Sequence, residues 1–365
     1  MPAKGVHVWK RRWRYGNGLI VATLFAVVIG ACGTDDRGSG DEASPVTVVV
    51  LTHDSFAMSE SLLEEFADRT GITIEIRPAG DAGEVLNQSI LSAGNPLGDV
   101  MFGVDNTFLG RALEADIFEA YRSPLLANIP AELQLDADSR LLPVDVGDVC
   151  VNFDRSAYGE GEAPSGFDDL IDPRFAGQLV VQNPATSSPG LAFLLATVAA
   201  FGDEGATTWR DYWAALVAND VAVQTGWSEA YYGDFTVGGG GERPMVVSYG
   251  SSPPAEVIFA DPPVSEAPTA VVEATCFRQI EFVGILSGTS HPEAARQVID
   301  FFLSVEVQED IPLNMFVYPA HAEAAVPSEF VEHTVVPSKP WTLDPEVIEA
   351  NRDRWIEQWV EIVLG

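Results

Sequence analysis

Three loops of this 365-residue sequence are rich in small polar side chains, and two of them also carry aromatic rings. Residues 226–232 contain Trp227, residues 248–253 contain Tyr249, and residues 183–190 contain two adjacent serines before a proline. The flat face of tryptophan or tyrosine holds a cationic aromatic ring by stacking and by cation–π attraction. Serine hydroxyls, and free backbone N–H groups where a helix begins, hold an anion or a polar head group. These loops therefore favour the binding of a small aromatic molecule with a polar end.

Motifs of catalysis are scarce in the same sequence. His53, Asp54 and Ser55 are adjacent, whereas a Ser-His-Asp relay needs partners that the fold brings together from separate segments. The sequence has no Gly-x-Ser-x-Gly elbow, Walker loop, zinc-ligand histidine pair or dinucleotide glycine fingerprint. The glycines at 238–241 lack the Lys-Ser/Thr of a phosphate loop, and we expect them to form an ordinary loop. The sequence thus predicts neither an enzyme nor a cofactor or metal site.

The segments that must position these loops alternate between strand and helix. Residues 46–52 and 100–104 are apolar runs typical of buried strands, and residues 72–77 alternate as a further strand. Ser61 and Glu64 have the spacing of a capping box for the helix between the first two strands. This β-α-β-α-β order predicts an α/β protein whose mostly parallel sheet is covered by helices on both faces.

Ligands of such sheets bind beyond the carboxyl ends of the strands. Asp54 and Ser55 follow the first predicted strand, and Asp105 and Asn106 follow the third. The aromatic and polar loops also follow predicted strands, so we expect all of them to meet at one cleft.

Two later segments are too long for one ordinary strand. They are residues 141–154 and 270–285, and the region between them carries an α/β pattern of its own. We therefore predict two lobes joined by these two crossing strands. Lobe 1 is predicted to comprise residues 46–146 plus 280–365, and lobe 2 residues 147–279.

Residues 1–32 have the features of an export signal. Basic residues between positions 4 and 14 precede an apolar run at 19–31, which is shorter than the roughly 20 residues that span a bilayer. The run ends at Cys32 in a pattern that resembles a bacterial lipoprotein signal, which implies acylation of this cysteine. Residues 33–45 are typical of a flexible tether. We therefore predict an exported protein, lipid-anchored at the outer face of the cytoplasmic membrane or in the periplasm.

The charge balance and the cysteines limit the partners and the compartment. Fifty-four acidic against 20 basic residues give a net charge of −34, which excludes nucleic acid as a partner because phosphates would be repelled. Such a surface reflects a high-salt habitat or concentrates a cationic ligand. Cys150 and Cys276 are an even pair in a compartment that permits disulfides, and the sequence leaves open whether they meet.

The mature chain resembles the thiamine-binding proteins of bacterial ABC importers, within the iron-, polyamine- and thiamine-type solute-binding proteins. The matching stretches occur in family order over nearly the whole mature chain. They are residues 53–56, 105–106, 183–191, 226–231, 248–253 and 317–319. The resemblance implies a type II periplasmic-binding-protein fold, with two α/β lobes and the ligand between them. It further implies a binding protein that captures thiamine or its phosphates and delivers them to an ABC permease and ATPase.

The resemblance also implies positions for the ligand contacts. Trp227 and Tyr249 fall where the family walls the ring system, and Ser187 and Ser188 where it binds the hydroxyethyl or phosphate end. Glu60 and Phe316 depart from the family, which has tryptophan at these places. The expected ligand-binding residues are Asp54, Ser55, Asp81, Ala82, Ser187, Ser188, Trp227, Tyr231, Tyr249, Gly250, Ser251, Ser252 and Phe316.

Two alternatives remain open at this point. Relatives in the same group bind ferric ion with adjacent tyrosines, a histidine and a carboxylate, and Tyr231, Tyr232 and His53 offer such a hard-metal set. Thiamine-degrading enzymes with this fold carry a nucleophilic cysteine near the first crossing, where Cys150 lies. Two nearby aspartates would disfavour its thiolate, which favours a buried or disulfide-linked Cys150.

Overall fold

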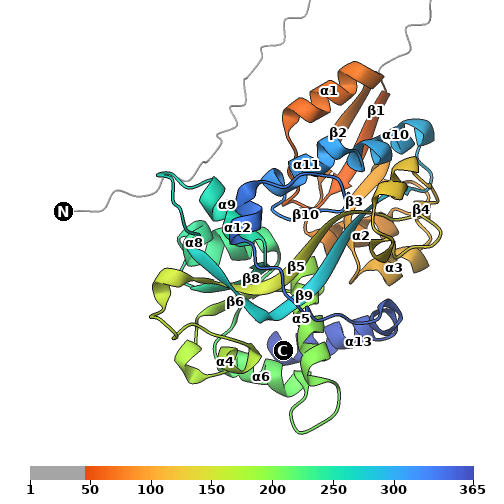
Figure 1. Cartoon of the computed structure of the whole chain (residues 1–365). Coiled ribbons are helices and arrows are strands. Elements are labelled where there is room, and N and C mark those ends of the chain that lie inside the picture. Colours follow the sequence, from red (N-terminus) through yellow and green to blue (C-terminus); the bar gives the residue numbers. More distant parts are fainter. Residues whose placement is uncertain (1–45) are drawn as a thin grey trace, which may run out of the picture. The chain divides into compact units, whose positions relative to one another are not determined.

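A computed structural model describes residues 46–365, so the predicted export signal, Cys32 and the tether lie outside the described residues. The described part of the chain is built on one ten-stranded sheet with the main strand order β2-β1-β3-β9-β5-β8-β6-β7 (Figure 1). The strands of this path are β1 (Val46–Thr52), β2 (Ile72–Pro78), β3 (Val100–Asp105), β5 (Leu142–Asp154), β6 (Leu179–Gln182), β7 (Ala222–Gln224), β8 (Met245–Tyr249) and β9 (Thr269–Leu286). Two short strands complete the sheet, β4 (Phe118–Glu119) beside β9 and β10 (Tyr318–Pro319) beside β5.

The first half of the sheet is β1 with β2 and β3, all parallel, and it is buried on both faces. Val48 and Val50 pack on one face and Leu51 on the other, which explains why β1 is a continuous apolar run. The first face is covered by α1 (Glu60–Thr70), α10 (Pro292–Phe302) and α11 (Val305–Asn314). The second face is covered by α2 (Ala82–Leu91) and α3 (Leu109–Glu114).

The second half is β6 with β7 and β8, again parallel. Its helices are α4 (Phe167–Leu170), α5 (Ser188–Phe201), α6 (Trp209–Ala218), α7 (Trp227–Glu229), α8 (Thr236–Gly239) and α9 (Ser252–Ile258). Most of α5 is fully buried, in keeping with its apolar sequence, and it lies against β9 and α6. Because β6 ends just before α5, the start of this helix points toward the strand ends of the sheet.

Two long antiparallel strands, β5 and β9, join the halves (Figure 1). They pair from Leu142 opposite Val283 to Asp154 opposite Thr269. One end of β9 lies beside β3, and one end of β5 lies beside β8. The predicted crossing strands are therefore confirmed, whereas the lobe boundaries stay a prediction.

The last helices complete the fold. They are α12 (Ser328–His333) and α13 (Pro345–Val363). α13 packs against α3 of the first half and α6 of the second, so it contacts both halves of the molecule. Its buried Trp359 meets Trp213 of α6 edge to face, with the ring centroids 5.4 Å apart.

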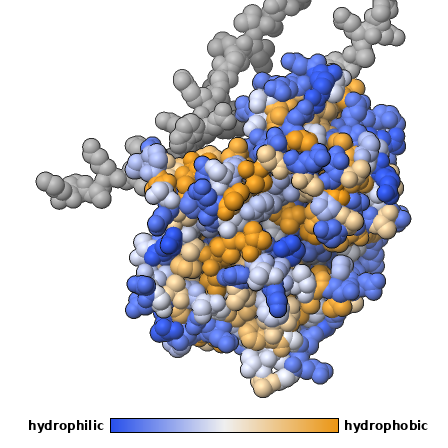
Figure 2. Space-filling view, in the orientation of Figure 1, coloured by the Kyte–Doolittle hydropathy of each residue, from blue (hydrophilic) through white to orange (hydrophobic). Residues whose placement is uncertain are grey.

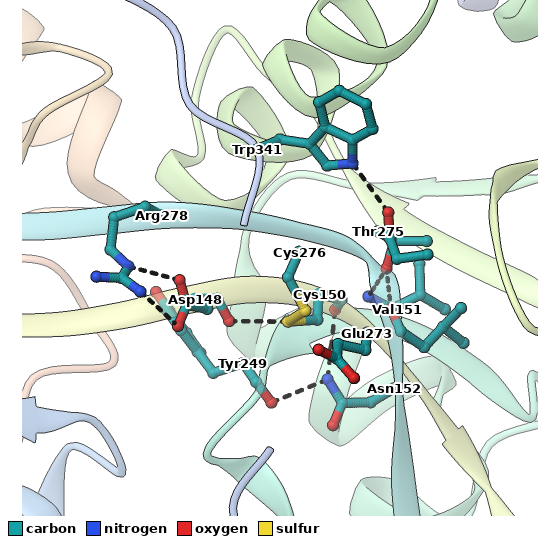
Figure 3. Close-up of a disulfide and its surroundings, with 12 residues drawn as sticks. Asp148, Cys150, Val151, Asn152, Tyr249, Glu273, Thr275, Cys276, Arg278 and Trp341 are labelled. Carbon is teal, nitrogen blue, oxygen red and sulfur yellow. Dashed lines mark hydrogen bonds and ion pairs between the residues drawn. A yellow bond between two sulfur atoms is a disulfide. The ribbon is translucent and has the colours of Figure 1, made fainter. Parts of the chain in front are cut away.

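Cross-links hold the two crossing strands together. Figure 3 shows the disulfide between Cys150 of β5 and Cys276 of β9, which answers the question that the sequence left open. Two residues away, Arg278 Nε donates to the Asp148 carboxylate at 2.6 Å, again joining β9 to β5. Since Cys150 is in a disulfide, it has no thiolate and cannot be the nucleophile of that alternative.

Two local predictions were wrong. The first helix begins at Glu60 with Ser59 as its N-cap, so Ser61 lies inside it and forms no capping box. The predicted glycine loop instead contributes to α8, whose Gly238 and Gly239 lie against the backbone carbonyls of Tyr231 and Tyr232. A Cβ at either glycine would collide with these carbonyls, so close packing rather than a loose turn requires the glycines.

The surface of the described part of the chain carries both hydrophilic and apolar regions (Figure 2). In Figure 2, hydrophilic residues (blue) cover much of the rim of the face shown, and apolar residues (orange) gather toward its middle. Among residues 46–365, none of the helices has both the length and the apolar character needed to cross a membrane.

Candidate ligand-binding site

A cavity of about 380 Å³ lies where strands of both halves end, within the usual size range of small-molecule sites. Its walls come from the segments that follow β1, β2, β6 and β7, from the end of β8, from β9 and from the loop before β10. The lining residues are His53, Asp54, Ser55, Phe56, Ala57, Asp81, Ala82, Ser188, Pro189, Trp227, Ser228, Tyr232, Tyr249, Glu281, Asn314, Met315, Phe316 and Val317.

The predicted residues divide into two groups. Those on the cavity wall are Asp54, Ser55, Asp81, Ala82, Ser188, Trp227, Tyr249 and Phe316. Those that do not line it are Ser187, Tyr231, Gly250, Ser251 and Ser252. Of the second group, Tyr231 contacts Trp227, Ser251 contacts Phe316 and Ser252 contacts Tyr249.

Trp227 is held in place from three sides. Its indole Nε1 donates to Ser248 Oγ at 2.9 Å, and its backbone N donates to Asp81 Oδ2 at 3.0 Å. Tyr231 stacks on the indole with ring centroids 4.8 Å apart and planes inclined by 17°. The indole of Trp227 is therefore already fixed, so its side chain loses little conformational entropy when a ligand stacks on it.

Tyr231 supports the Trp227 ring from behind. It belongs to a π-helical turn, Ala230–Asp234, and its hydroxyl donates to Glu256 Oε1 at 2.5 Å. Tyr231 and Glu256 line a second cavity of about 250 Å³. Trp227, Tyr232 and Phe316 line both cavities. Tyr231 thus stacks on Trp227 and does not line the first cavity, and its contact with the ligand stays a prediction.

Small polar residues hold the other walls. Ser252 Oγ lies 2.8 Å from Ser248 Oγ and accepts from the Tyr249 backbone N at 3.2 Å. Ser251 Oγ donates to the carbonyl of Phe316 at 2.6 Å. Phe316 has a φ of 57°, a conformation that is strained for a bulky residue, and this bond helps to retain it. Ser251 and Ser252 therefore position wall residues and do not themselves face the cavity.

The α5 N-terminus brings two buried serines to the site. Ser188 lies on the cavity wall, whereas Ser187, the N-cap of α5, lies behind it. Both serines are at most 2 % exposed. Ser187 Oγ lies beside Asp81 and Ser188 Oγ beside Asp105, but neither hydroxyl forms a hydrogen bond of good geometry. A buried hydroxyl without a partner is costly, so the Ser188 hydroxyl is available to a bound molecule.

Three carboxyl groups line the cavity, from Asp54, Asp81 and Glu281. Burial and the nearby Glu229 charge raise the pKa of Asp54. Burial raises the pKa of Asp81 to about 6, against the opposing effect of the N–H donors of Ala82 and Trp227. No lysine or arginine is among the lining residues of this cavity in the described chain. The electrostatic environment therefore favours a cation.

Sequence reasoning missed Glu281, which lies within β9 and is 5 % exposed. The sequence does show Glu281 as a lone acidic residue between Ile280 and Phe282 in an apolar strand. This pattern points to a functional residue, because a charged side chain is buried in an apolar strand only when another group pairs with it. The loop 314–317 was also mostly missed, since nothing in its own sequence shows that it reaches the strand ends.

The hard-metal set of the ferric alternative is not gathered at one point. His53 and Tyr232 line the cavity. The Tyr231 hydroxyl instead donates a hydrogen bond to Glu256, on the other side of Trp227. Burial lowers the pKa of His53 to about 4, so its imidazole is neutral near pH 7. Within residues 46–365, no group of three or more His, Cys, Asp or Glu side chains is arranged to hold a metal ion.

Comparisons with known proteins agree with this architecture. The family model for bacterial extracellular solute-binding proteins matches residues 95–341. The thiamine-binding periplasmic protein of Salmonella typhimurium is 27 % identical over 326 residues, which cover 88 % of this chain and 94 % of that protein. A solved periplasmic thiamin binding protein matches with a TM-score of 0.77 and 25 % identity, over 91 % of this chain and 99 % of its own.

The fold extends to proteins with other ligands. The iron-bound HitA structure from Pseudomonas aeruginosa matches with a TM-score of 0.68 at 19 % identity, over 87 % of this chain and 99 % of that one. Together with the crossing strands, these likenesses confirm the predicted two-lobed fold of the type II periplasmic binding proteins.

Proposed function

The chain belongs to the family of bacterial extracellular solute-binding proteins, and we propose that it captures thiamine or a thiamine phosphate for an ABC importer. The observation that carries this proposal is a cavity with the Trp227 and Tyr249 rings on its wall beside three carboxyl groups. Thiamine joins a pyrimidine to a positively charged thiazolium ring, so stacking and Coulomb attraction both favour it. The similarity to the thiamine-binding periplasmic protein of Salmonella typhimurium supports the same ligand. Membership of this family makes the chain a binding protein and not an enzyme.

Capture proceeds by closure of the two lobes. Hydrogen bonds already link segments from the two halves: Asp81 accepts from Trp227, and the Gly83 N–H donates to the Thr186 carbonyl at 3.0 Å. A ligand that touches both walls stabilises the closed arrangement, because it binds that arrangement more tightly than the open one. The lobes are residues 46–146 plus 280–365 and residues 147–279, with the hinge in β5 and β9.

The importer supplies the other partners. The closed, loaded protein is presented to a membrane permease driven by its ATPase. Residues 1–32 direct export, acylation of Cys32 anchors the protein, and residues 33–45 tether it close to the permease. Binding of the ligand needs no cofactor.

Intrinsic tryptophan fluorescence tests the proposed ligand. Thiamine stacked on Trp227 should quench the emission of the purified chain in a saturable way. An emission spectrum that does not change when thiamine is added in excess would contradict the proposal.

A substitution at Asp81 tests closure separately from helix capping. Asp81 Oδ1 accepts from the Ala82 N–H and caps α2, whereas Oδ2 accepts from Trp227 across the cleft. Asparagine caps helices as well as aspartate but has one acceptor oxygen, so Asp81→Asn should keep α2 and lose the bond across the cleft. We expect about tenfold weaker thiamine binding, from the loss of one charged hydrogen bond, with little change in the melting temperature.

Small-angle scattering should then show a larger radius of gyration for Asp81→Asn than for the unaltered chain at the same subsaturating thiamine concentration. Equal affinity and equal dimensions would show that the contact between Asp81 and Trp227 plays no part in closure.

A further inference from the structure

Three acidic residues form one row across the centre of the sheet. Glu281 of β9 is the direct partner of Asp105 in β3 on one side and of Asp145 in β5 on the other. Direct partners in neighbouring strands point to the same face, with Cβ atoms about 5 Å apart. All three are buried, with exposures of 0 % for Asp105, 1 % for Asp145 and 5 % for Glu281. We call this set the carboxyl row.

The carboxyl row is open to the cavity only through Glu281, and its polar atoms are incompletely paired. Asp105 Oδ1 accepts from the backbone and hydroxyl of Thr107, but Asp105 Oδ2 and Asp145 Oδ2 have no hydrogen-bond partner. His53 Nε2 and Ser188 Oγ, both more than nine-tenths buried on the cavity wall, lie beside Glu281 and Asp105 but form no hydrogen bond of good geometry. Unpaired donors and acceptors around one acidic floor indicate that a polar ligand completes the site.

The carboxyl row carries a proton when no cation is near. Like charges directly opposite one another in a sheet repel, and burial penalises each charge further. Burial and the charges of Asp145 and Asp105 raise the pKa of Glu281 well above its ordinary value. Burial also raises the pKa of Asp145, to about 7. Glu281 and Asp145 therefore share one proton as a pair.

The other groups that face Glu281 supply no compensating charge. His53 Nε2 lies 3.8 Å from Glu281 Oε1, but burial keeps this imidazole neutral. The Asp81 charge adds to the repulsion, and burial keeps the Tyr249 hydroxyl protonated. In the described chain, a cation that balances the carboxyl row must therefore come from the ligand.

Resting on the proposed function, we propose that Glu281 is a specificity-determining residue that recognises the positive charge of the ligand's ring, and that the carboxyl row gives up one proton to solvent when this ring binds. At lower pH the row of the free protein is protonated, and binding must expel the proton. Affinity for the cation therefore rises with pH and levels off once the free row is ionised.

The test compares thiamine with its neutral isostere, in which a carbon replaces the charged ring nitrogen. Calorimetric titrations of the full chain in buffers of different ionisation enthalpy measure the protons released. Thiamine should release close to one proton, and its affinity should rise up to about tenfold between about pH 7 and about pH 8. The isostere should bind without proton release and without this rise.

The variant Glu281→Gln should lose both the proton release and about tenfold or more of the thiamine affinity at the higher pH, while binding of the isostere is retained. Glu357→Gln, which removes an exposed charge from α13, is the matched control and should behave as the unaltered chain. If Glu281→Gln does not fold, Asp145→Asn is the second variant. It removes the other carboxyl group of the pair and should also abolish proton release.

The outcomes separate the two proposals. Thiamine binding without proton release, or with the same pH profile as the isostere, would overturn the role of Glu281 and leave the proposed function intact. Failure of the unaltered chain to bind either molecule at any pH would overturn the proposed function and this inference with it.

Discussion

Replacing Trp227 with alanine is expected to weaken thiamine binding by about 100- to 1,000-fold. Buried aromatic residues at the centre of a binding site lose about 3–4 kcal/mol of binding free energy on truncation, and each 1.4 kcal/mol is tenfold. Trp227 is half-buried in the absence of a ligand, and its indole is fixed by Ser248 and by the Tyr231 ring, so a ligand that stacks on it makes it such a residue. Titration calorimetry with thiamine measures the loss directly.

Tyr231→Phe is the matched control for this substitution. Phenylalanine keeps the ring that stacks on Trp227 and removes only the hydroxyl that donates to Glu256. We expect thiamine affinity within about threefold of the unaltered chain, since the lost hydrogen bond lies outside the cavity. If Trp227→Ala were as mild as Tyr231→Phe, the stacking wall would not be the source of affinity.

Replacing Trp359 with alanine is expected to lower the free energy of unfolding by about 3–5 kcal/mol. The side chain is fully buried on α13 and meets Trp213 of α6 edge to face. Its indole N–H has no hydrogen-bond partner, so the loss comes from apolar contact and from the cavity left behind. Urea unfolding followed by circular dichroism measures the change.

Val347→Ala on the same helix controls for helix propensity. Val347 is 43 % exposed, so its truncation removes little buried area and should change stability by less than about 0.5 kcal/mol. Similar losses for both variants would contradict the assignment of Trp359 to the core that joins α13 to α6.

The architecture was predictable because it depends on patterns that are local in sequence. The apolar run of β1 indicates a buried parallel sheet. The unusual length of β5 and β9 indicates two crossing strands. The disulfide and the carboxyl row were not predictable, because both depend on the register between β5 and β9. The Cys150–Cys276 pair spans 126 residues, and bulges shift the register of β9 against both neighbours.

Within the candidate site, the sequence pointed to the right loops but not to the direction of each side chain. Trp227 and Tyr231 lie in one motif, yet a π-helical turn sends the second ring behind the first. Ser251 and Ser252 were expected on the polar wall, and their hydroxyls instead bond to Phe316 and to the backbone of Tyr249. Such orientations depend on partners from other segments, which a motif does not contain.

The measurement that tests the central claim most directly is a calorimetric titration of the purified chain with thiamine, its phosphates and ferric citrate in parallel. The account predicts saturable binding of a thiamine species, one per chain, with a Kd of about 1 µM or below. It predicts no tyrosinate–iron absorption when ferric citrate is added. Absence of binding by every thiamine species, together with a visible tyrosinate–iron band, would contradict it and would make Tyr231, Tyr232 and His53 the centre of a ferric site.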